Sequence, residues 1–133
     1  MWVLSVVSTL SEFHIPWKIY VASASGFLGV VISLLGVLEF RKAKTTSDPR
    51  VPQQTTSFVK SGIYRLSRNP MYLGFLLILF GWAVYLSQVL SLLLVIAFVL
   101  YMNRFQIALE ERFMLEKFGD EYVSYKSKVR RWI

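Results

Sequence analysis

The sequence comprises 133 residues, of which 55% are hydrophobic and only 17% are charged, and it carries a formal net charge of +7. Soluble domains have about 25% charged residues, and a chain this short buries too little surface to hide so many apolar side chains. The composition therefore excludes an ordinary soluble domain and predicts an integral membrane protein. The sequence contains no cysteine, which excludes disulfides and thiolate chemistry. Its one histidine, His14, has no second imidazole with which to hold a metal, so no metal site is predicted.

The basic residues are concentrated in two stretches of the sequence. Seven lie in residues 41–68 and seven in residues 104–131, and only Lys18 falls elsewhere. Basic residues that flank apolar spans are typical of cytoplasmic loops. We therefore predict that both basic stretches lie on the cytoplasmic side of the membrane. Because no basic face is separate from the membrane flanks, nucleic acid is not a predicted partner.

The N-terminal part of the chain contains one short and one long apolar segment. Residues 1–16 fall short of the roughly 20 residues that a spanning helix needs, so they predict a short apolar helix. Residues 19–40 are long enough to form the first membrane span. Small residues recur within this span at three- and four-residue spacings, which lets another helix backbone approach closely in lipid. These residues are Gly26, Gly29, Ser33 and Gly36.

A polar loop and a long uncharged segment follow. Residues 41–68 are polar and basic, and a loop of this length is usually functional rather than a mere linker. Residues 71–103 contain no charged side chain. As one straight helix they would be about 50 Å long, well beyond the roughly 30 Å hydrocarbon core. A helical hairpin over residues 70–116 that turns near Ser87 and Gln88 fits the membrane better.

The last segment, residues 117–133, predicts an amphipathic helix. Apolar and aromatic residues recur there at three- and four-residue intervals, namely Phe118, Tyr122, Tyr125, Val129 and Trp132. Such a basic helix either lies in the headgroup plane or packs on the cytoplasmic surface of its own protein. The predicted fold is thus a single all-α membrane domain over residues 1–133. It has about three to four transmembrane helices, a C-terminal helical hairpin and an amphipathic cytoplasmic tail helix.

The start of the predicted hairpin carries the most informative motif. Asn69 and Pro70 predict a helix N-terminus, with Asn as the cap and Pro as the first helical residue. A cap alone does not explain Tyr64 and Arg68 before it, or Tyr72 after it. Free N–H groups at a helix start, an adjacent guanidinium and nearby aromatic rings can hold an anion beside a planar base. The motif therefore predicts a binding site for a ligand of that chemistry.

A second cluster lies at the end of the last apolar segment. Arg104 and Glu111 are seven residues apart, so an α-helix places them on one face, and Glu110 points about 100° away. Ionisable groups close to membrane depth are functional candidates. The alternative is a solvated helix end with ordinary i,i+4 ion pairs, which Arg112 and Glu116 support.

These motifs together resemble the superfamily of isoprenylcysteine carboxyl methyltransferases and phospholipid methyltransferases. The resemblance rests on the run from Gly62 to Gly74, on the Glu110-Glu111 pair, on Phe118-Gly119 and on Tyr122-x-x-Tyr125. The earlier Ala43-x-Thr45-Thr46 and Asp48-Pro49 also resemble its loop signature. The similarity covers about residues 40–133. It implies methyl transfer from S-adenosyl-L-methionine, bound at the cytoplasmic end of the hairpin, to a lipophilic acceptor that enters from the bilayer. It also implies a protein of a bacterial or archaeal cytoplasmic membrane, with its active site on the cytoplasmic side.

The motifs and the resemblance together predict which residues act. The acceptor would be an isoprenylcysteine-like carboxylate, a phospholipid amine or another small lipophile. Arg104 is predicted to orient an anionic acceptor, and Glu111, or alternatively Glu110, to serve as a base for an amine. Glu110 is expected near the amino end or the sulfonium of the cofactor. The other predicted cofactor-binding residues are Phe58, Val59, Tyr64, Arg68, Asn69, Pro70, Met71 and Tyr72.

Three positions depart from the family pattern. Ile63 replaces the usual Pro after Gly62, and Thr56 stands where the eukaryotic prenylcysteine enzymes have a His. Gln106 stands where those enzymes have the Arg that grips the substrate carboxylate. Two other hypotheses fit the sequence: a membrane reductase that uses NADPH, and a non-catalytic membrane scaffold or subunit with the same fold. Binding of S-adenosylhomocysteine rather than NADPH would separate the enzymes.

Overall fold

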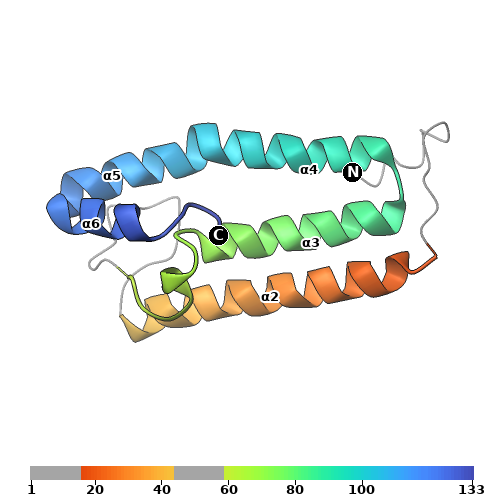
Figure 1. Ribbon diagram of the computed structural model, residues 1–133, viewed down its shortest axis with the longest axis horizontal. Helices are drawn as coiled ribbons and strands as arrows, with labels where there is room; N and C mark the ends of the chain where they lie inside the picture. Colours follow the sequence, from red (N-terminus) through yellow and green to blue (C-terminus); the bar gives the residue numbers. More distant parts are fainter. Residues whose placement is uncertain (1–15, 44–58) are drawn as a thin grey trace.

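The computed structural model describes residues 16–43 and 59–133, and every regular element in this part of the chain is a helix (Figure 1). The all-α prediction is therefore confirmed. Most of the predicted N-terminal helix and much of the polar loop, including Phe58 and Thr56, lie outside the described residues. The elements are α2 (Lys18–Lys42), the 3₁₀ turn η2 (Gly62–Arg65), α3 (Pro70–Leu86), α4 (Val89–Tyr101), the π-helix η3 (Met102–Ile107), α5 (Ala108–Phe118) and α6 (Asp120–Lys128).

Three long helical rods lie side by side along the molecule. Figure 1 shows α2, α3 and the continuous helix formed by α4, η3 and α5, with α6 folded back against α5. α2 packs along α3, and α3 packs against α4. The C-terminal end of α2, the start of α3, and α5 with α6 therefore gather at one end of the molecule. The residues singled out in the sequence lie at this end.

Two of these rods are long and apolar enough to cross a bilayer. They are Lys18–Lys42 and Val89–Phe118, while α3 is a shorter apolar helix of 17 residues. Large apolar residues remain exposed on their outer faces, including Phe27, which is 74% exposed, and Leu100, which is 64% exposed. Helices that are apolar on all sides and exposed outside the protein require lipid around them. The chain is therefore an integral membrane protein, as the composition predicted.

The contact between α2 and α3 depends on glycine. A Cβ atom added at Gly29 would lie 2.5 Å from the carbonyl oxygen of Gly74, and one at Gly36 would lie 2.9 Å from Cγ of Met71. Ser25 Oγ also donates a hydrogen bond to the carbonyl of Leu77 (2.7 Å). The predicted small-residue face is thus the face that packs on α3. Gly26 lies beside this face, and a Cβ there would meet nothing within 4 Å.

The predicted hairpin turn lies at Ser87 and Gln88. α3 ends at Leu86, and Ser87 adopts the left-handed conformation (φ 56°, ψ 39°) that commonly terminates helices. Gln88 is extended and occupies the N-cap position of α4, without a side-chain capping bond. The Ser87 hydroxyl donates to the carbonyl of Val84 (3.0 Å), so this side chain satisfies part of the helix end itself.

The last rod changes its hydrogen-bonding pattern between α4 and α5. Met102–Ile107 is a π-helix, whose i→i+5 bonds make each turn wider than an α-helical turn. Residues after the π-helix therefore point in different directions from those that they would have in an unbroken α-helix. Arg104 is exposed, whereas Glu111 is buried. The prediction that Arg104 and Glu111 share a face, which assumed an unbroken α-helix, is wrong for this reason.

The C-terminal segment packs on the protein itself and is helical over a shorter range than predicted. Gly119 (φ 56°, ψ −127°) separates α5 from α6, and α6 ends at Lys128 because Val129 is extended. Tyr122, Tyr125 and Val129 form a buried cluster against Met114 and Phe118. Trp132 lies beyond the helix and packs against a different cluster, formed by Tyr72, Met102 and Ile107. Of the two alternatives for the tail, packing on the protein surface is the one observed.

Candidate cofactor site

The turn that precedes α3 is held from two sides. The ring of Tyr64 meets that of Phe40 on α2 edge-on, with centroids 5.5 Å apart. The hydroxyl of Tyr125 on α6 donates to the main-chain carbonyl of Tyr64 (2.7 Å). Tyr64 is 5% exposed, and its burial raises the pKa of its hydroxyl well above the usual range. Val59, at the start of the same segment, is also buried.

A glycine in a left-handed conformation docks this turn on α2. Gly62 has φ +60°, and a Cβ there would lie 2.6 Å from the carboxyl carbon of Glu39. The same carboxylate accepts hydrogen bonds from Ser61 Oγ (2.8 Å) and Lys42 Nζ (2.9 Å). The site requires glycine at position 62 both for its backbone angle and for the close approach of Glu39.

α3 begins at the predicted position, but the Asn69 side chain does not cap it. Asn69 occupies the N-cap position and Pro70 begins α3, yet no side-chain capping bond is formed. Asn69 Nδ2 instead donates to the carbonyl of Arg131 (3.0 Å). The main-chain N–H of Arg68 likewise donates to the carbonyl of Arg130 (3.0 Å). The side chain expected to cap the helix therefore fastens the start of α3 to the C-terminal segment.

Glu110 faces a half-buried cluster at the first turn of α3. Its Oε1 atom accepts hydrogen bonds from the Tyr72 hydroxyl (2.5 Å) and from Gln106 Nε2 (2.7 Å). Both donors are neutral, and both bind the same oxygen. Among the residues that the structure describes, no cation forms an ion pair with Glu110, and its Oε2 atom receives no hydrogen bond from them. Glu110 thus has no counter-ion among the described residues, and its second carboxylate oxygen remains for a ligand.

Glu111, the next residue, has the opposite environment. Arg131 binds it with two hydrogen bonds, Nε to Oε1 (3.0 Å) and Nη2 to Oε2 (2.7 Å). Arg68 Nη1 lies 3.0 Å from Oε1, and Lys126 Nζ lies 3.7 Å from Oε2. The hydrogen bonds to Glu111 raise the pKa of Arg131. Three cations therefore surround one buried carboxylate, which joins the start of α3, α5, α6 and the C-terminal segment.

The C-terminal segment, residues 129–132, completes this arrangement. The Trp132 indole donates to Asn103 Oδ1 (3.0 Å), and Arg131 Nη1 lies 3.4 Å from the same oxygen. Asn103 belongs to the π-helix, so the segment connects that helix with the start of α3. Sequence reasoning assigned no role to Arg131 or Asn103, because each contacts partners that lie far away along the chain.

The structure brings most of the predicted site residues to one end of the molecule. Arg68, Asn69, Pro70, Tyr72, Glu110 and Glu111 lie around the first turn of α3, and Tyr64 lies in the turn that precedes it. Met71 faces α2 rather than this cluster, because its Cγ meets Gly36. Arg104 is exposed and forms no hydrogen bond or ion pair that joins it to these residues. Phe58 lies outside the described residues.

Comparison with known proteins gives one family match. A model of the phospholipid methyltransferase family matches residues 17–121. A probable protein-S-isoprenylcysteine O-methyltransferase of Oryza sativa subsp. indica is 34% identical over 113 residues, which is 83% of this chain and 58% of the rice protein.

Two further relatives match about half of the chain. A protein-S-isoprenylcysteine O-methyltransferase of Saccharomyces cerevisiae is 41% identical over 76 residues, 53% of this chain and 30% of the yeast protein. Methanethiol S-methyltransferase 1 of Bradyrhizobium diazoefficiens is 39% identical over 67 residues, 50% of this chain and 22% of that protein. The chain thus spans less than two thirds of each of these three relatives. No solved structure matches the chain significantly.

Proposed function

The chain belongs to the phospholipid methyltransferase family, and we propose that it transfers a methyl group from S-adenosyl-L-methionine to a lipophilic acceptor in the membrane. Relatives that act on isoprenylcysteine and on methanethiol carry methyltransferase names, which supports a membrane methyltransferase of this type. The proposed site lies around the first turn of α3, between Tyr64, Tyr72 and Glu110.

The observation that carries this proposal is the uncompensated charge of Glu110. Its carboxylate is held by Tyr72 and Gln106, which are neutral, while the cations nearby are committed to Glu111. A carboxylate fixed without a counter-ion is complementary to a cationic ligand, because burial of a charge is costly unless it is paired. S-adenosyl-L-methionine carries two such groups, an ammonium and a sulfonium.

Other groups at this end suit the remaining parts of the cofactor. Besides its ion pair with Glu111, Arg68 has a buried Nε atom with no hydrogen-bond partner among the described residues, so one donor of its guanidinium is unused. The first N–H groups of α3 offer further donors to an anion. Tyr64 and Tyr72 supply rings of the kind against which a sulfonium or an adenine packs. The donor set therefore fits the cofactor, whose chemistry would be transfer of its methyl group from sulfur.

The residues of this chain contribute positioning rather than proton transfer. Methyl transfer is an in-line displacement, and alignment of the two reactants lowers its barrier. Glu110 would hold the cationic end of the cofactor. Glu111 was predicted as a base, but its ion pairs with Arg68 and Arg131 favour a role in positioning the first turn of α3. The orienting of the acceptor by Arg104 stays a prediction. Arg104 is exposed on η3, so it would contact the acceptor from that side.

The acceptor would approach from the bilayer at the cytoplasmic end of the helices. The candidates are an isoprenylcysteine-like carboxylate, a phospholipid amine and a small lipophilic thiol. Gln106 is neutral and is bound to Glu110, so it does not supply the positive charge that a carboxylate acceptor would need. A carboxylate acceptor would therefore depend on Arg104, and if Arg104 does not reach the acceptor, an uncharged acceptor is favoured.

The test compares two glutamate variants of α5. Glu110→Gln keeps the acceptor oxygen for Tyr72 and loses the charge, whereas Glu116→Gln removes an exposed charge on the same helix. A hydrogen bond to a charged group contributes about 1.5–3 kcal/mol, so Glu110→Gln should weaken binding of S-adenosylhomocysteine at least about tenfold. Calorimetry in detergent measures this affinity, and transfer of a radiolabelled methyl group to lipid extract measures turnover.

The control and the alternatives give the outcomes that would contradict the proposal. Glu116→Gln should bind S-adenosylhomocysteine like the parent. Equal affinity of Glu110→Gln and the parent would remove Glu110 from the site. Binding of NADPH without S-adenosylhomocysteine would support the reductase, and binding of neither would support the non-catalytic scaffold.

A further inference from the structure

A pocket separate from the Glu110 cluster lies between α6 and the segment that leads into α3. It has a volume of about 480 Å³, within the range of small-molecule sites. One wall is formed by Lys60 and Arg65, and the other by residues of α6 and the position that follows it. The full lining is Lys60, Arg65, Glu121, Ser124, Tyr125, Lys128 and Val129.

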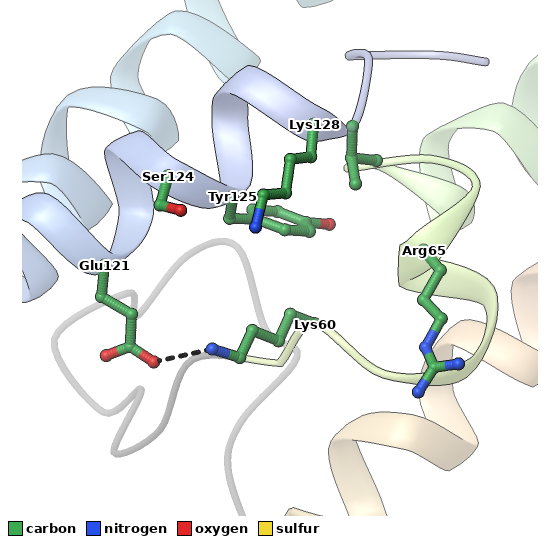
Figure 2. A pocket seen from close by; sticks show the side chains of 7 residues that line it. Lys60, Arg65, Glu121, Ser124, Tyr125 and Lys128 are labelled. Carbon is green, nitrogen blue, oxygen red and sulfur yellow. Dashed lines mark hydrogen bonds and ion pairs between the residues drawn. The ribbon is translucent and has the colours of Figure 1, made fainter.

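The lining of this pocket is basic. Three cationic side chains and one carboxylate leave it with a net charge of +2. Figure 2 shows Lys60 and Lys128 extending into the pocket from opposite walls, with Arg65 at its edge. Arg65 and Lys128 form no ion pair with a carboxylate of the described residues. These cations repel one another unless an anion lies between them.

The one carboxylate in the pocket does not cancel this charge. Glu121 lies 3.2 Å from Lys60 Nζ, and the two side chains are 54% and 57% exposed. An exposed pair of this kind contributes about 0–1 kcal/mol, so a phosphate can compete with Glu121 for Lys60. Glu121 binds only one of the three cations, so an anion that enters the pocket meets Arg65 and Lys128 without a carboxylate partner among the described residues.

The floor of the pocket is apolar, which distinguishes it from a site for a small inorganic ion. Tyr125 and Val129 are buried, at 8% and 9% exposure. The Tyr125 hydroxyl is bound to the carbonyl of Tyr64, so the ring rather than the hydroxyl is available to line the floor. Cations at the rim above an apolar floor suit an amphiphilic ligand, whose phosphate and attached carbon chain need different surroundings.

The pocket also lies where lipid phosphates are found. Its wall before α3 is fastened to the C-terminal end of α2 by the bond from Ser61 to Glu39. α2 is a candidate membrane span of 25 residues, so its end lies at the headgroup layer. Phospholipid phosphates are the most abundant anions in that layer, and clustered basic residues at span ends bind anionic headgroups.

We propose that this pocket binds the phosphate of an anionic phospholipid headgroup, as a lipid site separate from the site of methyl transfer. The phosphate lies between Lys60 and Lys128, and the glycerol carbons lie over Tyr125. The site fixes α6 to the membrane surface through the bound lipid. This assignment does not depend on the methyltransferase activity.

The experiment measures binding of short-chain phosphatidylglycerol to the detergent-purified protein by native mass spectrometry. The pocket variant is Lys60→Gln with Lys128→Gln. The matched control is Arg41→Gln with Arg112→Gln, which removes two exposed cations outside the pocket. Phosphatidylcholine, which is neutral overall, and soluble glycerol phosphate serve as the competing ligands.

The two variants should separate specific binding from general attraction. A lysine near an anionic lipid contributes about 1 kcal/mol, so loss of both should weaken phosphatidylglycerol binding at least about tenfold. The control should bind like the parent, and phosphatidylcholine should bind more weakly than phosphatidylglycerol. Equal binding by the pocket variant and the control would overturn the site. Displacement of the lipid by millimolar glycerol phosphate would overturn its assignment to a lipid and indicate a free phosphate ligand.

Discussion

The adjacent residues Glu110 and Glu111 have opposite electrostatic surroundings. Glu110 receives hydrogen bonds from two neutral donors, and Glu111 is surrounded by Arg68, Arg131 and Lys126. Because neighbouring residues of a helix point about 100° apart, one position can face a ligand while the next faces the protein. In the proposed function, this pair of residues supplies one carboxylate for binding the cofactor and one for holding the structure together.

Removal of Arg131 should therefore destabilise the protein. Arg131→Gln leaves Glu111, whose side chain is 9% exposed, without its bidentate partner. Loss of charged hydrogen bonds at such a position costs about 1–3 kcal/mol, and we expect a lower midpoint of thermal unfolding in detergent. Arg130→Gln, whose side chain is exposed, is the control and should unfold like the parent. An unchanged midpoint for Arg131→Gln would mean that Arg68 and Lys126 suffice to hold Glu111.

Among the described helices, α2 and α3 form the most extensive contact. Their backbones approach because Gly29, Gly36, Gly74 and Gly81 present no side chain at the contact. In lipid there is little hydrophobic gain from bringing helices together, so packing of this kind is what holds them. The position of α2 matters for the site, since Glu39 and Phe40 at its end hold the turn that contains Tyr64.

Two glycines of α2 provide a matched test of this contact. Gly29→Ala places a methyl group 2.5 Å from the carbonyl oxygen of Gly74, so the helices must move apart, at a cost of about 1–3 kcal/mol. Gly26→Ala meets nothing within 4 Å and gains helix propensity, so it should be neutral or stabilising. Thermal unfolding in detergent would compare the two. Equal effects of both exchanges would contradict the close packing of α2 on α3.

The sequence was sufficient to predict those elements whose signals are local. The absence of charge over residues 71–103 required a hairpin, and Asn69-Pro70 placed the start of α3. The end of α6 was not predictable, because Val129 and Trp132 continue the helical spacing while the chain itself becomes extended. The π-helix gives no composition signal, and it was the reason that Arg104 and Glu111 were wrongly placed on one face.

The candidate site was predictable only in part for a related reason. The motifs indicated which residues belong to the candidate site, so Tyr64, Tyr72 and Glu110 were predicted from the sequence. Its ion pairs depend on contacts between distant parts of the chain, such as the pairing of Glu111 with Arg131. Nothing in the spacing of single residues indicates which of several arginines reaches a given carboxylate.

The orientation of the protein across the membrane can be tested directly. The ends of α2, α3 and α5 that carry the candidate site lie away from the turn between α3 and α4. We predict that the site end is cytoplasmic, because the basic residues flank it. Ser87 in the turn is only 4% exposed, whereas the adjacent Val89 is 47% exposed and suits labelling.

Single cysteines provide the measurement of this topology. Val89→Cys should react with an impermeant thiol reagent in intact cells, whereas Ser124→Cys on α6 should react only after lysis. The absence of native cysteine makes each signal unambiguous. The reverse pattern would place the candidate site on the outer face of the membrane.

The bonds between the start of α3 and residues 130 and 131 have a consequence for the order of biosynthesis. The bond from Asn69 to the carbonyl of Arg131 joins residues that are 62 positions apart. A ribosome therefore completes α3, α4, α5 and α6 before the partner of Asn69 exists, although each helix can enter the membrane as it is made. The first turn of α3 is consequently finished last, after translation has passed Arg131. The contacts that complete the candidate site therefore form only after all of these helices have been synthesised.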